Sequence, residues 1–181
     1  MNNFTIEQKI GETQSEINTY CITNIPTQTN ELLGVILNTE VYFQKLTLKY
    51  YTQEVEADIK TIRALLEEIE ALKEGGRTID GYARGELDSC ASLLFLASSE
   101  KMISPNSILR ISGVEDELSG TVSDIEEGLS ALKEYNNFIL SVLKTNLNEE
   151  LYRKCEKAIR KGKTVHIKAK ELYEANIAII M

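Results

Sequence analysis

The sequence predicts a single α/β domain spanning residues 1–181. Two observations lead to this fold class. Short apolar stretches of strand length alternate with longer segments of helical periodicity, and the order strand, helix, strand occurs twice. Strands joined in this way through a helix form parallel, right-handed βαβ units. A chain of this length is also sufficient to bury one substantial core.

The N-terminal region predicts two strands and a helix. Phe4–Ile10 alternates apolar and polar residues, as an edge strand does. Thr19–Ile25 is the second expected strand and precedes a proline. Thr29 or Asn30 can cap a helix that continues to about Asn38.

The second βαβ unit is defined by the clearest helix in the chain. It follows a strand expected over Lys45–Tyr51 and precedes one over Thr78–Ala83. The helix has apolar residues at intervals of three and four, which predicts one buried face. These residues are Val55, Ile59, Ile62, Leu66 and Ile69. Gly75 and Gly76 provide the C-terminal cap.

The stretch from Gly85 to Ser112 predicts a turn, a helix, a loop and a buried strand. Asp88 is a good N-cap for a helix over Ser89–Ser98, whose residues are small or apolar on all sides, as in a helix packed all round. Pro105 and the following asparagine mark a turn, and Ile108 to Ile111 form a short apolar strand.

The C-terminal part predicts more helix than strand. Gly113–Gly120 is polar and flexible, a loop or extended arm. Ser123 and Glu126 can form the capping box of a long helix. The residues expected to face inward on this helix are Ile125, Leu129, Leu132, Phe138, Ile139 and Val142.

A further helix is expected to begin at Asn148, with Leu151, Cys155 and Ile159 on one side, and to stop at Gly162. After it we expect a short strand at 165–167 and a short helix at 169–175.

Composition excludes several classes of function. A net charge of −8 disfavours nucleic acid and anionic membrane surfaces as partners. No apolar run approaches the length of a membrane span, and the N-terminus has no secretion signal, which favours a cytoplasmic protein. The three widely spaced cysteines are expected to be reduced thiols. With a single histidine in the chain, neither a metal centre nor another cofactor is expected.

The stretch around Ser89 resembles the active-site segment of the Clp protease proteolytic subunit family. In that family a glycine precedes the catalytic serine by four positions, as Gly85 precedes Ser89. The resemblance extends through the small apolar helix and the Pro105 turn, and it covers the chain from about Thr19 to the end. It implies a ClpP/crotonase-like spiral of βαβ units, with Thr121–Lys144 as the long "handle" helix that joins rings of subunits.

The same resemblance implies that the parts needed for peptide hydrolysis are missing. Ser89 matches the nucleophile, but Ser112 occupies the position of the histidine base. The two oxyanion-hole glycines of the family correspond to Thr52 and Gln53 here, while the Cys90 N–H matches the second oxyanion donor. A serine without a base is almost fully protonated at neutral pH, and loss of the histidine costs a serine protease about 10⁶-fold in kcat.

Substitutes for the missing groups are weak. No aspartate follows Asp124, so the third member of the triad is absent, and Glu156 near its position is expected to be a surface residue. His166 is expected away from Ser112 on a C-terminal strand. Cys90 lies at a helix N-terminus, which can lower a thiol pKa, but it has no histidine partner and is interpreted as a core residue.

These residues favour a catalytically inactive homologue with a structural, regulatory or peptide-binding role. Two alternatives stay open: a serine peptidase whose base comes from His166 or a neighbouring subunit, and a crotonase-type acyl-CoA-binding protein. The resemblance also implies a homo-oligomer, such as a ring, and as partners an active Clp-type subunit or an AAA+ ATPase.

Overall fold

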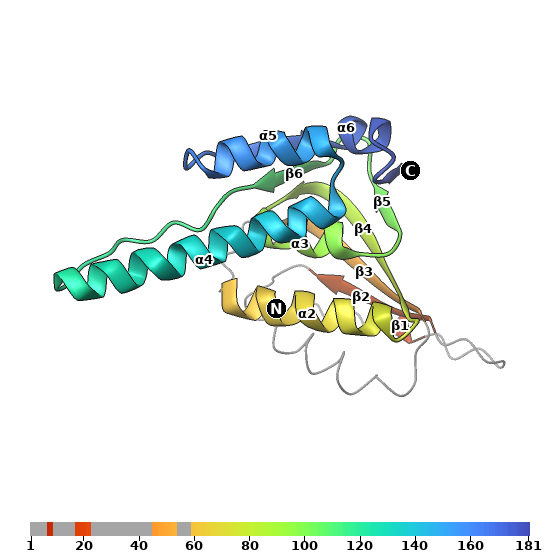
Figure 1. Ribbon diagram of the computed structural model, residues 1–181. Coiled ribbons are helices and arrows are strands. Elements are labelled where there is room, and N and C mark those ends of the chain that lie inside the picture. Colours follow the sequence, from red (N-terminus) through yellow and green to blue (C-terminus); the bar gives the residue numbers. More distant parts are fainter. Residues whose placement is uncertain (1–6, 9–16, 23–44, 54–58) are drawn as a thin grey trace.

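A computed structural model describes residues 7–8, 17–22, 45–53 and 59–181 of the chain. These residues form a mixed α/β structure with a curled sheet and helices packed on it (Figure 1). The sheet has the order β1-β2-β3-β4-β5-β8, and β6 branches from β4 to pair with β7. The β1–β2 and β6–β7 pairs are antiparallel and the other pairs are parallel. The α/β class predicted from the sequence is therefore confirmed.

The N-terminal strands are β1 (Glu7–Gln8), β2 (Ile17–Ile22) and β3 (Lys45–Gln53). The second and third were expected at 19–25 and 45–51, so their existence is confirmed. The edge strand expected over Phe4–Ile10 is described only at its two central residues. The helix expected to end near Asn38 lies outside the described residues.

The βαβ unit around helix α2 (Ile59–Glu74) was predicted correctly, and Val55, also expected on this helix, lies outside the described residues. Helix α2 buries a stripe that includes Ile62, Leu66 and Ile69, and it joins β3 to the parallel strand β4 (Thr78–Leu87). The helix ends where Gly76 takes a left-handed backbone with φ of 81°. The Gly76 and Arg77 N–H groups then bond to the carbonyls of Lys73 and Leu72 at 2.9 and 3.0 Å, which satisfies the last turn.

Strand β4 is longer than expected because it changes partner half-way along. Its first half pairs with β5 (Lys101–Ile103) and its second half with β6 (Ile108–Ile111). Between the halves, Gly85 has φ of 91°, a backbone that side chains rarely adopt. The buried Ser107 hydroxyl accepts the Gly85 N–H at 3.0 Å and so fixes the branch point.

Strand β5 was missed by the sequence analysis, which expected a loop there. It has only three residues, Lys101, Met102 and Ile103, which is too short an apolar stretch to predict a strand. Its neighbours hold it in place: β4 on one side and the C-terminal strand β8 (Ile179–Ile180) on the other.

Helix α3 (Ser89–Ala97) is the centre of the core. Seven of its nine residues are buried, as expected for a helix that is apolar all round. It packs on β4 at Gly81, where an added Cβ would lie 2.6 Å from Ser98 Oγ and 3.0 Å from Phe95 Cδ2. The close approach of helix and strand therefore requires a glycine at this position.

Helix α4 (Val122–Asn146) is long and extends well beyond the sheet, with the preceding segment running beside it (Figure 1). The predicted capping box of Ser123 and Glu126 is wrong. Thr121 is the N-cap and Asp124 the reciprocal acceptor, because the helix starts two residues earlier. Of the residues expected to face inward, Ile139 is buried, whereas Ile125 and Leu129 are 40% and 44% exposed. These two lie on the projecting part of the helix.

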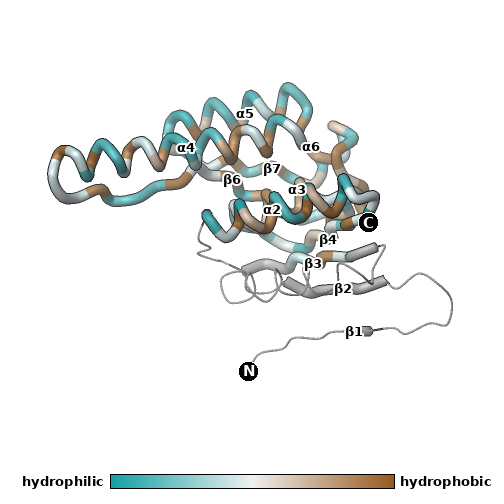
Figure 2. Tube along the Cα trace, turned by 60° about the horizontal axis from the view of Figure 1, so that its bottom comes forward, coloured by the Kyte–Doolittle hydropathy of each residue, from teal (hydrophilic) through white to brown (hydrophobic). Residues whose placement is uncertain are grey.

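The C-terminal elements agree with the sequence analysis. Asn148 caps α5 (Glu149–Ile159), which buries Leu151, Cys155 and Ile159. Strand β7 (Val165–Lys168) and helix α6 (Ala169–Glu174) follow. Figure 2 shows polar and apolar residues alternating along the tubes of α4 and α5, as in amphipathic helices. No helix in the described ranges has the length and apolar character needed to cross a membrane.

Candidate functional site

The first element of the candidate site is the start of α3. Asp88, directly after β4, has an extended backbone and its carboxylate accepts the Ala91 N–H at 2.8 Å. The cap was predicted from the sequence and is confirmed. It places Ser89 on the first turn of a helix whose positive end faces the site.

The second element is Ser112, directly after β6. Strand β6 runs parallel to the end of β4, in register at Glu86 with Ile108 and Leu87 with Leu109. This pairing brings Ser112 to Ser89, although 23 residues separate them in sequence. The two Oγ atoms are 2.8 Å apart, and the Ser112 backbone N–H donates to Ser89 Oγ, also at 2.8 Å.

These contacts define what the two hydroxyls can do. Each serine hydroxyl has one hydrogen to donate and two lone pairs. The Ser112 backbone N–H occupies one lone pair of the Ser89 hydroxyl. The second contact of the Ser89 hydroxyl is with the Ser112 hydroxyl. Within the described part of the chain, neither hydroxyl has a hydrogen bond to a histidine or a carboxylate. The pair therefore offers hydrogen bonds to a ligand but contains no group that would accept a proton at neutral pH.

A cavity of about 720 Å³ opens beside the hydroxyl pair. Its walls come from the starts of α2 and α3, from the segment after β6 and from α4. Leu93, Leu132 and Ile139 contribute apolar surface, while Ser89 and Ser112 provide hydroxyls. Polar and apolar groups contribute about equally to the lining, so the cavity can contact both apolar and hydrogen-bonding parts of a ligand.

The segment Gly113–Gly120, called the arm below, forms one wall of this cavity and is held against α4. The Asn136 side chain accepts the Val114 N–H at 2.8 Å and donates to the Val114 carbonyl at 3.4 Å. Gly113 leaves room for this amide, because an added Cβ would lie 2.6 Å from Asn136 Oδ1. Further along, Leu118 contacts Gly128 so closely that an added Cβ there would meet Leu118 Cδ2 at 2.6 Å. The sequence predicted a flexible loop or an extended arm, and the segment takes the extended form with contacts to α4.

The positions that the resemblance assigns to an oxyanion hole lie nearby in the backbone. Gln53 is paired with Leu87, two residues before Ser89, and the register shifts between Tyr51 and Gln53. Thr52 lies at this irregularity. Cys90, the other expected donor, follows Ser89 on α3 and lines the cavity. It is half-buried and packs against the core, in line with its interpretation as a core residue.

The residues considered for the missing base and for the missing aspartate, and the last aspartate of the chain, lie elsewhere. His166 is exposed on β7, where it is in register with Arg110. Glu156 on α5 accepts from Arg160 at 2.8 Å, in agreement with the expectation of a surface residue. Asp124 is used in the cap of α4. None of the three lines the cavity.

Sequence reasoning missed several residues of the site. Lys60 and Tyr135 line the cavity from α2 and α4, and Glu115 and Asp116 from the arm. No motif marks them, because their proximity depends on how α4 crosses the body. Among the described residues no group of three or more His, Cys, Asp or Glu side chains is placed to hold a metal ion.

The protein is therefore an α/β protein whose candidate site is a cavity beside two hydrogen-bonded serine hydroxyls at the start of a buried helix. No protein-family model matches the sequence. A search of curated proteins also finds no match.

Proposed function

We propose that this protein is a catalytically inactive homologue of the Clp protease proteolytic subunit, which acts as a structural or peptide-binding subunit. The observation that carries the proposal is the 2.8 Å contact of Ser89 with Ser112. The resemblance expects a nucleophile and its base at these two positions. Here they are neighbours in space, and the second is a hydroxyl that cannot act as a base near pH 7.

The topology supports the finer fold assignment, a ClpP/crotonase-like spiral. Parallel crossovers connect β3 to β4 through α2 and β4 to β5 through α3, and the sheet curls where β4 changes partner. The long helix α4 follows the serine pair at the place where the family has its handle.

A binding role is supported by the cavity itself. Its apolar walls, hydroxyl pair and extended arm are suited to hold an apolar side chain of a peptide beside exposed backbone groups. A bound peptide would then not be cleaved, because Ser89 has no base to take its proton and so cannot attack the peptide bond.

An active-site serine probe tests the inactive assignment. We expect a fluorophosphonate to leave Ser89 unlabelled in intact-mass and peptide mass spectrometry, under conditions that fully label an active serine hydrolase. Casein and short fluorogenic peptides should be hydrolysed no faster than by the Ser89→Ala variant. Labelling that disappears in Ser89→Ala would instead favour the peptidase alternative.

A further inference from the structure

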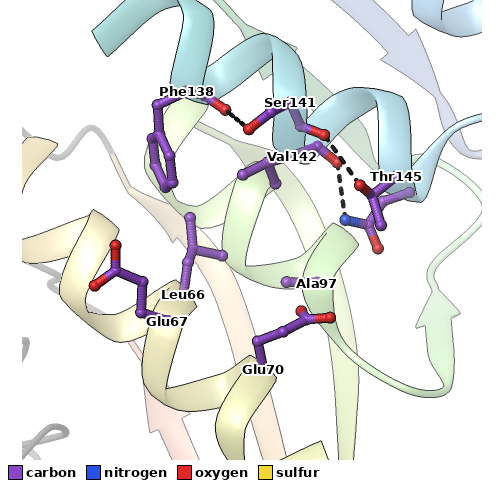
Figure 3. A pocket seen from close by; sticks show the side chains of 9 residues that line it. Leu66, Glu67, Glu70, Ala97, Phe138, Ser141, Val142 and Thr145 are labelled. Atoms are coloured by element: carbon purple, nitrogen blue, oxygen red, sulfur yellow. Dashed lines mark hydrogen bonds between the residues drawn. The ribbon is translucent and has the colours of Figure 1, made fainter. Parts of the chain in front are cut away.

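A second cavity, of about 190 Å³, lies between α2 and α4 over the end of α3 (Figure 3). It shares no lining residue with the cavity beside Ser89. Leu66, Ala97 and Val142 form its apolar surface, and the ring of Phe138 closes one side. An aliphatic chain placed there would bury its surface against these four residues.

The hydroxyls at this cavity have no hydrogen left to offer a ligand. Ser141 donates to the Phe138 carbonyl at 2.7 Å, and Thr145 donates to the Ser141 carbonyl at 3.1 Å. Each hydroxyl carries one hydrogen, so only lone pairs remain. Asn146 uses one of its two amide hydrogens on the Val142 carbonyl at 2.9 Å, and it keeps the other hydrogen as a donor and its carbonyl oxygen as an acceptor.

Two carboxylates, Glu67 and Glu70, complete the polar lining from α2. Each contacts a cation through one oxygen: Glu67 Oε1 lies 3.0 Å from Arg63, and Glu70 Oε2 lies 3.7 Å from Lys73. The second oxygen of each carboxylate is not used in these pairs. Neither Arg63 nor Lys73 lines the cavity.

Each of these two cations is shared with another group. Arg63 also binds Glu134 at 3.1 Å, so one guanidinium serves two carboxylates. The ammonium of Lys73 donates to the Ala97 carbonyl at 3.1 Å, closer than its distance to Glu70. Glu67, Glu70 and Glu134 thus share Arg63 and Lys73. Beside its apolar walls, the polar part of the lining consists mainly of acceptors and carboxylates.

We propose that this cavity binds a primary ammonium group carried on a short aliphatic stem. An ammonium has three hydrogens and no acceptor, which complements a lining of lone pairs and carboxylates. The stem would lie on Leu66, Ala97 and Val142, as lysine stems lie on apolar surfaces. The group can belong to a lysine side chain of a partner peptide or to a free alkylamine. The inference does not depend on the function proposed for Ser89.

Amide NMR spectra of the full chain provide the test, with n-butylammonium as the probe and n-butanol as its uncharged counterpart. We expect butylammonium to shift the amide signals of residues 66–70 and 141–146, with a dissociation constant on the order of millimolar for so small a ligand. Butanol should bind more weakly. A short acetylated peptide containing one lysine distinguishes the sources: tighter binding than butylammonium indicates a protein-borne lysine, and weaker binding a free amine.

Matched variants locate the interaction. Glu70→Gln should weaken binding about two- to fivefold, the range for a half-exposed ion pair, and Thr145→Val should also weaken it. Glu74→Gln is the control, because it removes the same charge one turn further along α2 at a residue that does not line the cavity. Ser141→Leu should block the cavity from an exposed position and abolish the shifts.

Three results would overturn the proposal. Butanol could bind as tightly as butylammonium, Glu70→Gln and Glu74→Gln could lose the same amount of butylammonium affinity, or the amide shifts could persist in Ser141→Leu. Unchanged amide spectra of the unliganded variants, apart from signals near the substitution, show that each variant is folded before it is titrated.

Discussion

At the scale of the residue, backbone groups determine the geometry of the serine pair. The Ser112 N–H holds Ser89 Oγ at 2.8 Å, and this N–H is present whatever side chain occupies the position. Asp88 fixes the other partner by capping α3. The proximity of the pair therefore follows from the strand register, while its chemistry follows from the two hydroxyls.

We expect Ser112→His alone to leave the protein inactive. The new imidazole would have no carboxylate to set its tautomer, a defect that costs about 10⁴-fold in kcat in a serine protease triad. Hydrolysis of short fluorogenic peptides should stay at the level of the Ser89→Ala,Ser112→His double variant. Turnover that depends on Ser89 would show that an orienting group is present.

Substitution of Gly81 tests the packing of α3 on β4. A methyl group there would meet Ser98 Oγ at 2.6 Å and the Phe95 ring at 3.0 Å, both buried. Gly81→Ala should lower the free energy of unfolding by about 1–3 kcal/mol, as overpacking of a core does. Urea denaturation measures this.

The double variant Gly81→Ala,Ser98→Ala serves as the control. It removes the hydroxyl from the closest contact and should recover part of the loss. A Gly81→Ala protein as stable as the wild type would contradict the close approach of helix and strand.

At the scale of the element, α4 combines two environments in one helix. Its C-terminal half packs on the body and buries Ile139, Leu140 and Leu143. Its N-terminal half projects, so its stability depends on the capping box and on the arm, through Leu118 and Gly128. Helices without tertiary packing are marginal in water, and a single cap matters most there.

Replacement of the cap should unravel the projecting end. Thr121→Ala removes the hydroxyl that accepts the Asp124 N–H at 3.3 Å and donates to the Asp124 carboxylate at 2.7 Å. The expected cost is about 1 kcal/mol, local to the first turns. Hydrogen exchange of residues 124–128 should accelerate several-fold. Ser123→Ala, two residues after the N-cap, is the control and should change little.

The same cap predicts that the stability of the first turn of α4 depends on pH. The Thr121 hydroxyl, and then its N–H, stabilise the ionised Asp124 carboxylate and hold its pKa below the ordinary value of 3.8. A lowered pKa means that the stabilisation is complete above 3.8 and is lost as pH falls through the folded-state value. Exchange at the start of α4, corrected for intrinsic rates, should therefore rise only in that acidic range. In Asp124→Asn this pH dependence should disappear.

At the scale of the whole molecule, the projecting helix carries apolar surface into solvent. Val122, Ile125 and Leu129 are 74%, 40% and 44% exposed. A continuous apolar strip at the end of a projecting element is typical of a protein–protein contact. This observation supports the expected homo-oligomer, although a partner of another kind would use the same surface.

We expect light scattering at micromolar concentration to give a mass above the 20.4 kDa of one chain. Leu129→Asp should shift the distribution toward the monomer, because it places a charge in the contact. Asn137→Asp adds the same charge at an exposed position of α4 outside the apolar strip and should have no effect. A wild-type protein that is monomeric throughout would contradict self-association.

The local sequence pattern was enough to predict the elements whose residues are clearly either buried or exposed. The amphipathic stripe of α2 and the Asp88 and Asn148 caps were predicted from neighbouring residues alone. Each depends on contacts within one or two turns, and such contacts leave a readable spacing. The resemblance around Ser89 likewise identified the two serines of the candidate site.

Only the tertiary structure decided which features lie together. Strand β5 has only three residues and exists because β4 and β8 flank it, and β4 extends past Gly85 because it gains β6 as a second partner. The exposure of Ile125 and Leu129 follows from where the body ends beneath α4, which helical periodicity does not encode. Lys60 and Tyr135 reach the Ser89 cavity for the same reason. Periodicity specifies which residues share a face of a helix, whereas the packing of distant segments determines what covers that face.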